Sequence, residues 1–209
     1  MPTEADRFSK FIVDYIKNED FQTLDLKLLR KLCNNISHTD LVTIIKRCRR
    51  KIDNNTCLHV AADEENFEMI DILLGKLNDE EKLRLLKIKA TYNSVTVTWL
   101  CIINGGTPWA MALARSSTHE ALRREIYEAV LVYTCQNDDA QALQLLLGVI
   151  PSDTLLPMLR TITLGSLKLS CIQTTVRHGL NTFISMLLQH LSTESKVSLL
   201  LQQSPLNGG

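Results

Sequence analysis

The residues of this chain that could do acid–base, nucleophilic or metal chemistry are scattered along it. Five histidines and six cysteines are present, and none of them falls into an HExxH, HxH or CxxC pattern. The chain also lacks a GxSxG nucleophile motif and the phosphate-binding GxxxxGK and GxGxxG loops. Because catalysis needs several such groups in one pocket, the sequence predicts a protein that is not an enzyme, with no catalytic residues, no metal site and no cofactor.

The carboxylates and thiols fit structural roles better than chemical ones. Acidic residues cluster at Asp63-Glu64-Glu65, Asp79-Glu80-Glu81 and Asp138-Asp139, where we expect helices to end or start. Acidic residues at helix N-termini complement the helix dipole. Most of the cysteines lie in apolar helical patterns, in which a free Cys behaves as a small hydrophobe. We therefore expect buried, reduced thiols, as in an intracellular protein.

Charge and hydropathy limit which classes of partner and which cellular locations we expect. The 23 Lys and Arg residues balance the 23 Asp and Glu residues, so there is no general case for nucleic acid or an anionic membrane surface. The start of the chain lacks the apolar core of a signal peptide, and no run approaches the ~18 apolar residues of a membrane helix. We expect a cytoplasmic protein without membrane insertion, with nucleic acid disfavoured as a partner and the nucleus left open as a location.

One short run stands out by its charge, Lys46-Arg47-Cys48-Arg49-Arg50-Lys51. The helix dipole favours cations at the C-terminus of a helix, and this structural role is the first interpretation. The second interpretation is a basic patch for an acidic peptide, nucleic acid or a nuclear import receptor. No aromatic residues flank the run, so nucleic-acid binding has weak support. The residues of this candidate patch are Lys46, Arg47, Arg49, Arg50 and Lys51.

The elements that position these residues repeat along the chain. Residues 56–74 match residues 170–188 without a gap, and partial copies lie upstream and around residues 129–156. Each copy predicts a short first helix, an apolar second helix and a third helix. Thr56 is the expected N-cap of a first helix, and Asn78 with Glu81 forms a capping box for a third helix.

The region after residue 94 departs from this pattern. Ser94 to Ile103 reads SVTVTWLCII, which is rich in β-branched residues and partly alternating, and Asn104-Gly105-Gly106 should then turn the chain. We predict a strand or hairpin-like insertion near residues 94–106, whose edge either recruits a partner by strand pairing or simply pairs locally. Another partial copy starts with a first helix at Thr107, and residues 120–134 read as one long helix whose boundaries stay open between Ser116 and Gln136.

The best copy resembles the ankyrin repeat. Thr56-Cys57-Leu58-His59, Ala61-Ala62 and Leu73-Leu74 are similar to the TPLH tetrad, the Ala pair and the closing Leu-Leu of that family. The resemblance implies an all-α fold, an α-solenoid of stacked ankyrin-like repeats, in which His59 has a structural role and bonds neighbouring backbone. Repeats of this kind stack because one unit cannot bury its apolar face alone.

We expect a single array over residues 1–209, with units at about 8–52, 53–104, 105–128, 129–165 and 166–209. The ending, Gln202 to Gly209, resembles the lead-in to another unit. We therefore expect the chain to be truncated at its C-terminus.

The resemblance implies a non-enzymatic scaffold or adaptor that presents loops and a helical face to another protein, whose identity the sequence does not give. One alternative is a regulatory or targeting ankyrin domain of a larger signalling protein, channel or enzyme, and another is a host-directed bacterial effector. Self-association through an exposed end face is also open. The expected partner-binding residues lie in the 94–106 insertion and at the outward ends of first helices. They are Val97, Trp99, Ile102, Asn104, Asp63, Glu64, Arg115 and Arg177.

Overall fold

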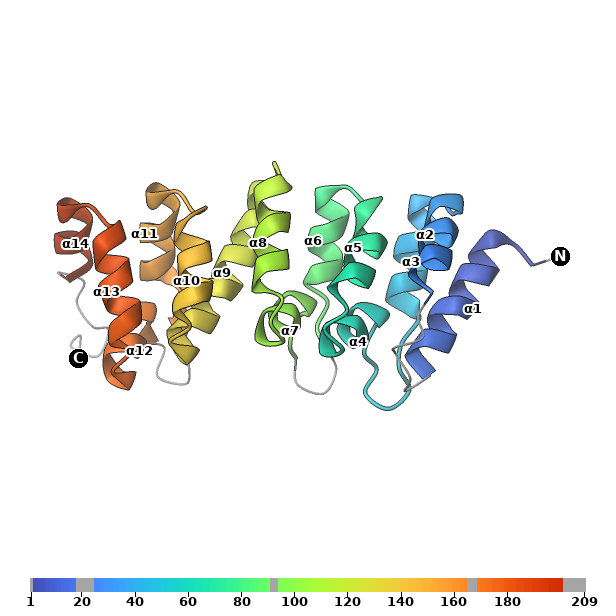
Figure 1. Cartoon of the computed structure of the whole chain (residues 1–209), viewed down its shortest axis with the longest axis horizontal. Coiled ribbons are helices and arrows are strands. Elements are labelled where there is room, and N and C mark those ends of the chain that lie inside the picture. The colour runs from blue at the N-terminus through green and yellow to red at the C-terminus, as the bar shows by residue number, and fades with distance from the viewer. Residues whose placement is uncertain (1, 18–24, 91–93, 165–168, 201–209) are drawn as a thin grey trace. The chain divides into compact units, whose positions relative to one another are not determined.

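The computed structural model describes residues 2–17, 25–90, 94–164 and 169–200, and its regular structure is almost entirely α-helical (Figure 1). This confirms the expected fold class, an all-α repeat solenoid. None of the helices in the described ranges has the length and apolarity needed to cross a membrane. Residues 202–209, which suggested a truncated C-terminus, lie outside the described residues.

The first seven helices are α1 (Glu4–Lys17), α2 (Leu26–Asn35), α3 (His38–Arg47), α4 (Cys57–Asp63), α5 (Phe67–Gly75), α6 (Asp79–Leu86) and α7 (Val97–Ile103). The elements that follow are α8 (Thr107–Ser116), α9 (Glu120–Asn137), α10 (Ala140–Leu147), α11 (Ser152–Thr161), β1 (Thr163–Leu164), β2 (Leu169–Ser170), α12 (Cys171–His178), α13 (Asn181–His190) and α14 (Thr193–Leu200).

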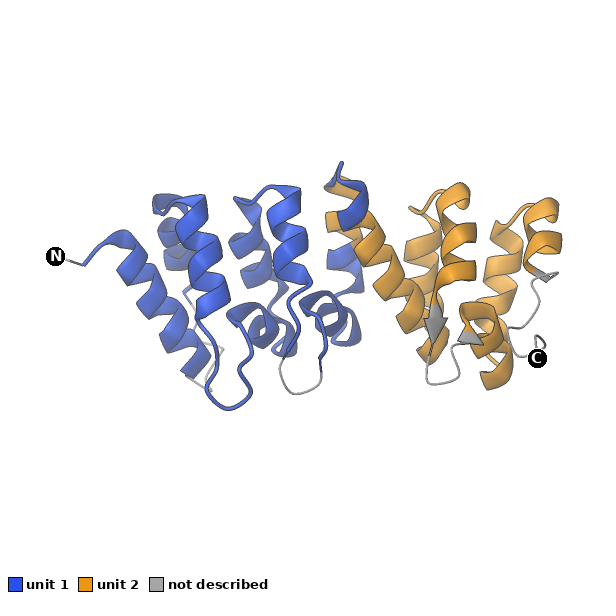
Figure 2. Cartoon of the chain, turned by 180° about the vertical axis from the view of Figure 1, so that it is seen from behind, with its two compact units in different colours: residues 1–110, 117–122 blue, residues 111–116, 123–209 orange. Residues whose placement is uncertain are grey.

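Packing divides the chain into two compact units (Figure 2). Unit 1 holds residues 1–110 and 117–122, and unit 2 holds residues 111–116 and 123–209. Helices α8 and α9 contribute residues to both units. The division into five repeats over one array therefore stays a prediction.

In unit 1 equivalent helices of successive repeats stack on one another. α2 packs against α5, α3 against α6 and α4 against α7, while α1 packs against α2, α3 and α4. α1 buries Phe8, Ile12, Tyr15 and Ile16, at the spacing of one helical face. In unit 2 α10 packs against α13, and α11 against α14.

The turn before a second helix contains a residue with positive φ in four places. Glu65, Gly105, Asp138 and Gly179 all adopt positive φ, at 55°, 84°, 50° and 66°. In three of these turns the next residue donates its N–H back to the first helix, as from Asn66 to the Ala61 carbonyl at 2.8 Å. This left-handed residue with a returning hydrogen bond is a common way to end a helix. Its recurrence identifies α4–α5, α7–α8 and α12–α13 as equivalent pairs.

The predicted strand or hairpin near residues 94–106 is wrong. Residues 97–103 form the helix α7, capped by the Thr96 side chain, which accepts a hydrogen bond from the Trp99 N–H at 3.2 Å. α7 is apolar on nearly all sides and packs against α4, so tertiary burial outweighs the strand preference of its β-branched residues. Consequently α8, which starts at Thr107, is a second helix and not the first helix that the sequence suggested.

A pair of antiparallel backbone residues precedes each of three first helices, and the segment that each pair encloses is here called a finger. Antiparallel backbone pairs close them at Arg49↔Thr56, Lys89↔Thr96 and Thr163↔Ser170. The first finger, residues 49–56, leads into α4. The region between residues 116 and 136 differs, because α9 runs as one continuous helix there. This confirms the long helix expected from residue 120.

Candidate partner-binding cleft

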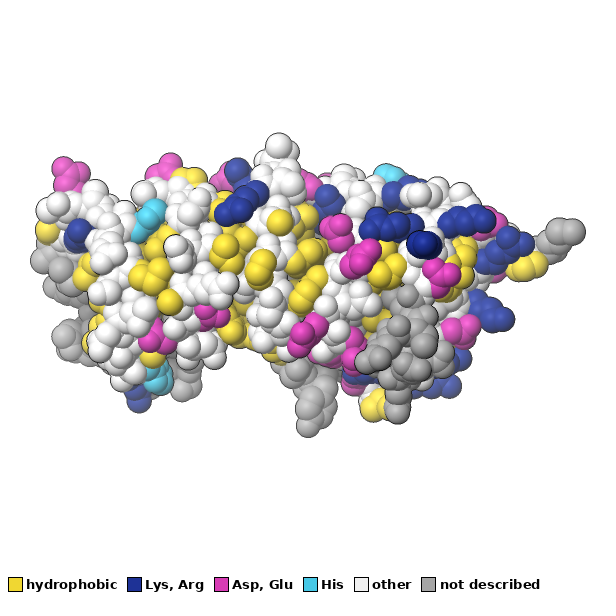
Figure 3. All heavy atoms as spheres, in the orientation of Figure 1, with side chains coloured by type: hydrophobic (Ala, Val, Ile, Leu, Met, Phe, Trp, Pro, Cys, Tyr) yellow, Lys and Arg dark blue, Asp and Glu magenta, His cyan; other side chains and the backbone are white. Residues whose placement is uncertain are grey.

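A half-open cleft of about 920 Å³ lies between α1, the end of α3 and the first finger. α1 supplies one wall, Cys48 follows α3, and Glu64 contributes from the end of α4. The lining combines apolar and cationic side chains, and Figure 3 shows Lys and Arg side chains gathered over the end of unit 1 that holds α1 and α3. The lining residues are Ser9, Val13, Ile16, Lys17, Arg47, Cys48, Arg49, Arg50, Lys51, Ile52, Asp53 and Glu64.

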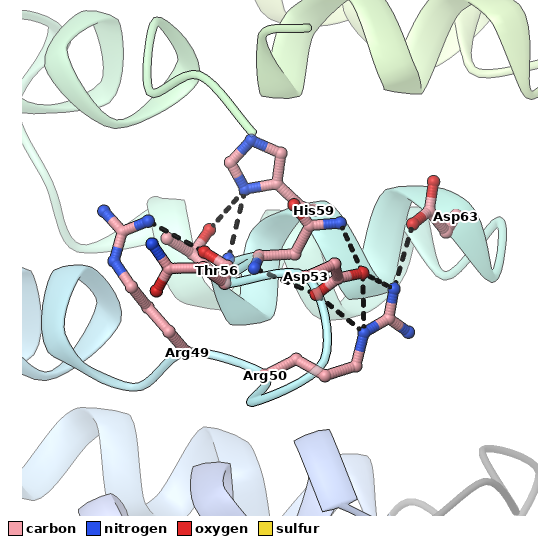
Figure 4. Close-up of polar contacts among 8 residues, drawn as sticks. Arg49, Arg50, Asp53, Thr56, His59 and Asp63 are labelled. Carbon is pink, nitrogen blue, oxygen red and sulfur yellow. Dashed lines mark hydrogen bonds and ion pairs between the residues drawn. The ribbon is translucent and has the colours of Figure 1, made fainter. Parts of the chain in front are cut away.

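The first finger is held in one conformation by its own hydrogen bonds (Figure 4). The Asn54 N–H donates to the Arg50 carbonyl at 2.7 Å, and the Arg50 N–H donates to the Asn55 carbonyl at 2.8 Å. The Asp53 carboxylate accepts from the Asn55 N–H at 3.0 Å and from the Arg50 guanidinium at 2.9 Å. Asn54 has positive φ, 58°, which asparagine tolerates better than most residues. The tip, Lys51 and Ile52, is therefore held outward, and Ile52 is 91% exposed.

The cations of the cleft differ in how far they are neutralised. Arg50 pairs with Asp53 and lies 3.8 Å from Asp63, and the hydrogen bonds from Arg50 hold the pKa of Asp53 below its usual value. Arg49 instead donates to two backbone carbonyls, those of Lys46 at 3.1 Å and Asn54 at 2.9 Å. These carbonyls fix the Arg49 guanidinium in place, but they do not cancel its charge.

Three more cations, Lys17, Arg47 and Lys51, line the same cleft on exposed side chains. Within the described part of the chain none of the three has an ion-pair partner. Together with Arg49 they leave the described lining with more cations than carboxylates, since Asp53 and Glu64 are the two carboxylates among these lining residues.

His59 contacts Thr56 at the start of α4, as Figure 4 shows, and also reaches the backbone that follows α6. Its Nδ1 accepts from the Thr56 N–H at 3.3 Å and lies 2.8 Å from the Thr56 hydroxyl. Its Nε2 lies 3.1 Å from the Ile88 carbonyl, which calls for a neutral ring with the proton on Nε2. Burial lowers the pKa of His59 to about 4. His59 is thus a structural residue, as the sequence predicted.

Comparison with known proteins adds one match, because the ankyrin repeat family model matches residues 53–80. The chain contains an ankyrin repeat. The matched residues run from the first finger through α4 and α5 into α6. No curated protein and no solved structure matched the chain. Ankyrin repeats are generally protein–protein interaction modules and are typically non-enzymatic.

The ankyrin-type stacking explains where the predicted insertion residues lie. Val97 and Ile102 are completely buried in α7, so these core residues cannot meet a partner and their assignment is corrected. Trp99 is partly buried. Asn104 donates its side-chain N–H to the Ala62 carbonyl at 3.2 Å and so joins two successive repeats. The four residues do not form a protruding surface, because the hairpin that was expected to carry them is a helix.

The remaining predicted residues are exposed but separate. Asp63 and Glu64 end the first helix of the matched ankyrin repeat, where Glu64 lines the cleft and Asp63 lies beside Arg50. Arg115 and Arg177 are exposed in unit 2. Their role in partner binding stays a prediction.

The basic patch is the predicted set that the structure brings together. Arg47, Arg49, Arg50 and Lys51 all line the cleft, whereas Lys46 is exposed on α3 and does not. Sequence reasoning missed Ile52, although an apolar residue inside a run of charged and amide residues is a usable signal. It also missed the wall from α1, because no local pattern connects residues 13–17 with residues 47–53.

Within the described residues no group of three His, Cys, Asp or Glu side chains could hold a metal ion. The six cysteines are free and buried. Burial raises the pKa of Cys33 to about 11 and that of Cys101 to about 12. Because the thiolate is the reactive form, these two thiols are poor nucleophiles, and they act as small apolar side chains in the repeat core.

Proposed function

We propose that this chain is a non-enzymatic interaction scaffold or adaptor that binds another protein through the cleft of unit 1. The observation that carries the proposal is the cleft itself, which places cations that have no ion-pair partner among the described residues beside an exposed isoleucine on an ordered finger. Ile52 is 91% exposed, so its side chain adds little to the core of unit 1 and is available to a partner. The reduced state of six buried thiols fits a cytoplasmic setting, which is also part of the proposal.

The physical gain from such binding is considerable. Full burial of an isoleucine side chain is worth about 1.5–3 kcal/mol, and covering Ile52 would recover that free energy. Binding also costs conformational entropy, and a loop that is already ordered reduces this cost. The ion pair of Arg50 with Asp53 and the hydrogen bonds inside the finger order it before a partner arrives.

Affinity capture from cell lysate, read by mass spectrometry, tests the proposal. The baits are the wild-type chain, the Ile52→Asp variant, and a matched control, Val176→Asp, which places the same charge on an exposed apolar residue of unit 2. Val176 is 63% exposed, so both substitutions should leave the fold intact, as circular dichroism would verify.

We expect a partner that wild type and Val176→Asp retain and Ile52→Asp loses. If all three baits retain the same partner equally, the binding surface lies outside the cleft and the proposal is refuted.

A further inference from the structure

The charge of the cleft indicates what kind of segment occupies it. Resting on the proposed function above, we infer that the occupant is an acidic segment of a partner protein, rich in Glu or Asp, that also carries an aliphatic side chain. The inference combines the charge of the lining side chains with the apolar contacts available beside them.

The charge argument rests on which cations are already satisfied. Arg50 is neutralised by Asp53, but Lys17, Arg47, Arg49 and Lys51 have no carboxylate partner in the described part of the chain. Arg49 is also oriented in advance by two backbone carbonyls. Carboxylates are the natural partners of such a set, and charge-assisted hydrogen bonds are stronger than neutral ones.

The apolar argument rests on both sides of the cleft. Val13 and Ile16 line the α1 wall, and Ile52 lines the finger. An apolar side chain between these two surfaces would be removed from water on both faces, and the volume of about 920 Å³ has room for it. Binding sites of roughly 300–1,000 Å³ commonly combine apolar lining with a few placed polar groups.

The same lining argues against nucleic acid. Among the described residues that line the cleft none is aromatic, so these side chains offer bases no stacking platform. Asp53 and Glu64 place carboxylates in the lining, which disfavours a continuous line of phosphates. A polypeptide that alternates acidic and aliphatic side chains suits this mixture better, because it brings charge and apolar surface together.

Fluorescence anisotropy with the full chain tests the inference. The probe is a short fluorescein-labelled peptide of Glu residues interspersed with Leu. Two control peptides replace either every Glu by Gln or every Leu by Ser, and a labelled single-stranded oligonucleotide of equal charge serves as a third control. The variants are Lys51→Glu and Arg47→Glu, with Lys46→Glu as the matched control, because Lys46 is exposed in the same basic run but does not line the cleft.

We expect Lys51→Glu and Arg47→Glu each to weaken peptide binding about tenfold, which corresponds to about 1.4 kcal/mol. Lys46→Glu should change binding about twofold or less. Binding should also weaken as salt is added, since exposed charges are screened beyond about 8 Å at physiological ionic strength. Both peptide controls should bind more weakly than the probe.

Other outcomes overturn the inference. Equal weakening by all three charge reversals would mean non-specific attraction to the basic run. Tighter binding of the oligonucleotide, lost in Lys51→Glu, would assign the cleft to nucleic acid. Absence of peptide binding, with a captured partner that still depends on Ile52, would refute the acidic segment and leave the proposed function standing. Absence of both would refute both.

Discussion

The buried histidine of the ankyrin repeat makes unit 1 sensitive to acid. His59 is completely buried and its pKa is lowered to about 4, from an ordinary value of 6.5, because burial disfavours the charged ring. The unfolded chain therefore takes up a proton near pH 6.5, whereas the folded chain resists protonation until pH falls near 4. Between these values the unfolded state binds more protons, so the stability of the fold decreases as pH falls.

The size of the effect follows from the two pKa values. Each pH unit between them changes the free energy of unfolding by about 1.4 kcal/mol. From about pH 7 to pH 5 the loss should be about 2 kcal/mol, and it should level off at about 3 kcal/mol once the folded ring is also protonated.

The control variant comes from the chain itself. In α12 the position equivalent to His59 is Gln173, whose side-chain carbonyl accepts from the Ser170 N–H at 2.9 Å. His59→Gln should keep that cap and lose part of the hydrogen bond to the Ile88 carbonyl, at a cost of about 1 kcal/mol at neutral pH.

The assay is urea unfolding at several pH values, followed by tryptophan fluorescence. Both tryptophans, Trp99 and Trp109, belong to unit 1, so the signal reports on the unit that holds His59. Wild type should lose about 2 kcal/mol more than His59→Gln between neutral pH and about pH 5. Parallel pH curves for the two proteins would show that His59 does not titrate as its burial requires, and the reasoning would fail.

Three further predictions concern contacts between and within repeats, each read by the same unfolding assay. The Lys76 ammonium donates to three backbone carbonyls at the end of α2, at 2.9–3.1 Å, so Lys76→Met should destabilise unit 1 by about 2 kcal/mol, against little change for the exposed Lys27→Met. A Cβ on Gly106 would lie 2.5 Å from a backbone carbonyl, so Gly106→Ala should cost about 2 kcal/mol. Gly75→Ala, whose Cβ meets nothing within 4 Å, should be neutral or stabilising by about 0.5 kcal/mol. Glu65 adopts positive φ, so Glu65→Gly should stabilise by about 0.5 kcal/mol, and a loss of stability would contradict the strain assigned to that turn.

The starts of several helices could be predicted from their capping residues. The box predicted at the start of α6 is present, since the Asn78 N–H donates to Glu81 at 3.1 Å and the Glu81 N–H donates back at 2.9 Å. Thr56 is the N-cap residue of α4, as expected. Such signals are readable because donor and acceptor lie within one helical turn.

The helix α7 shows where sequence reasoning fails. Val97, Thr98, Leu100, Cys101 and Ile102 are all buried, so no polar face marks a period of 3.6 residues. A short, fully buried helix and a buried strand then have the same apolar pattern. The turn at Gly105, read as the end of a hairpin, is in fact the left-handed turn between two helices.

The sequence predicted the basic side of the cleft but not its apolar wall. The basic run is contiguous, so its charge is visible in the sequence, and the structure keeps most of it together around residues 47–51. The wall from Val13 and Ile16 comes from packing of α1 against α3 and α4. Only the packing of three separate helices shows that apolar surface faces the basic finger, and this pairing is what favours an amphipathic acidic partner.

The fingers do not recur between every pair of repeats in the described residues. A finger separates a third helix from the next first helix at residues 49–56, 89–96 and 163–170. At α9 the two helices are instead fused into one helix of 18 residues, and its end at Asn137 leads into the same left-handed turn, at Asp138, that follows the other first helices. The next turn is therefore kept although α9 contains no finger, because a continuous helix satisfies its own backbone hydrogen bonds. Unit 1 therefore holds the fingers at residues 49–56 and 89–96, unit 2 holds the finger at residues 163–170, and a continuous helix stands at α9 in place of a finger.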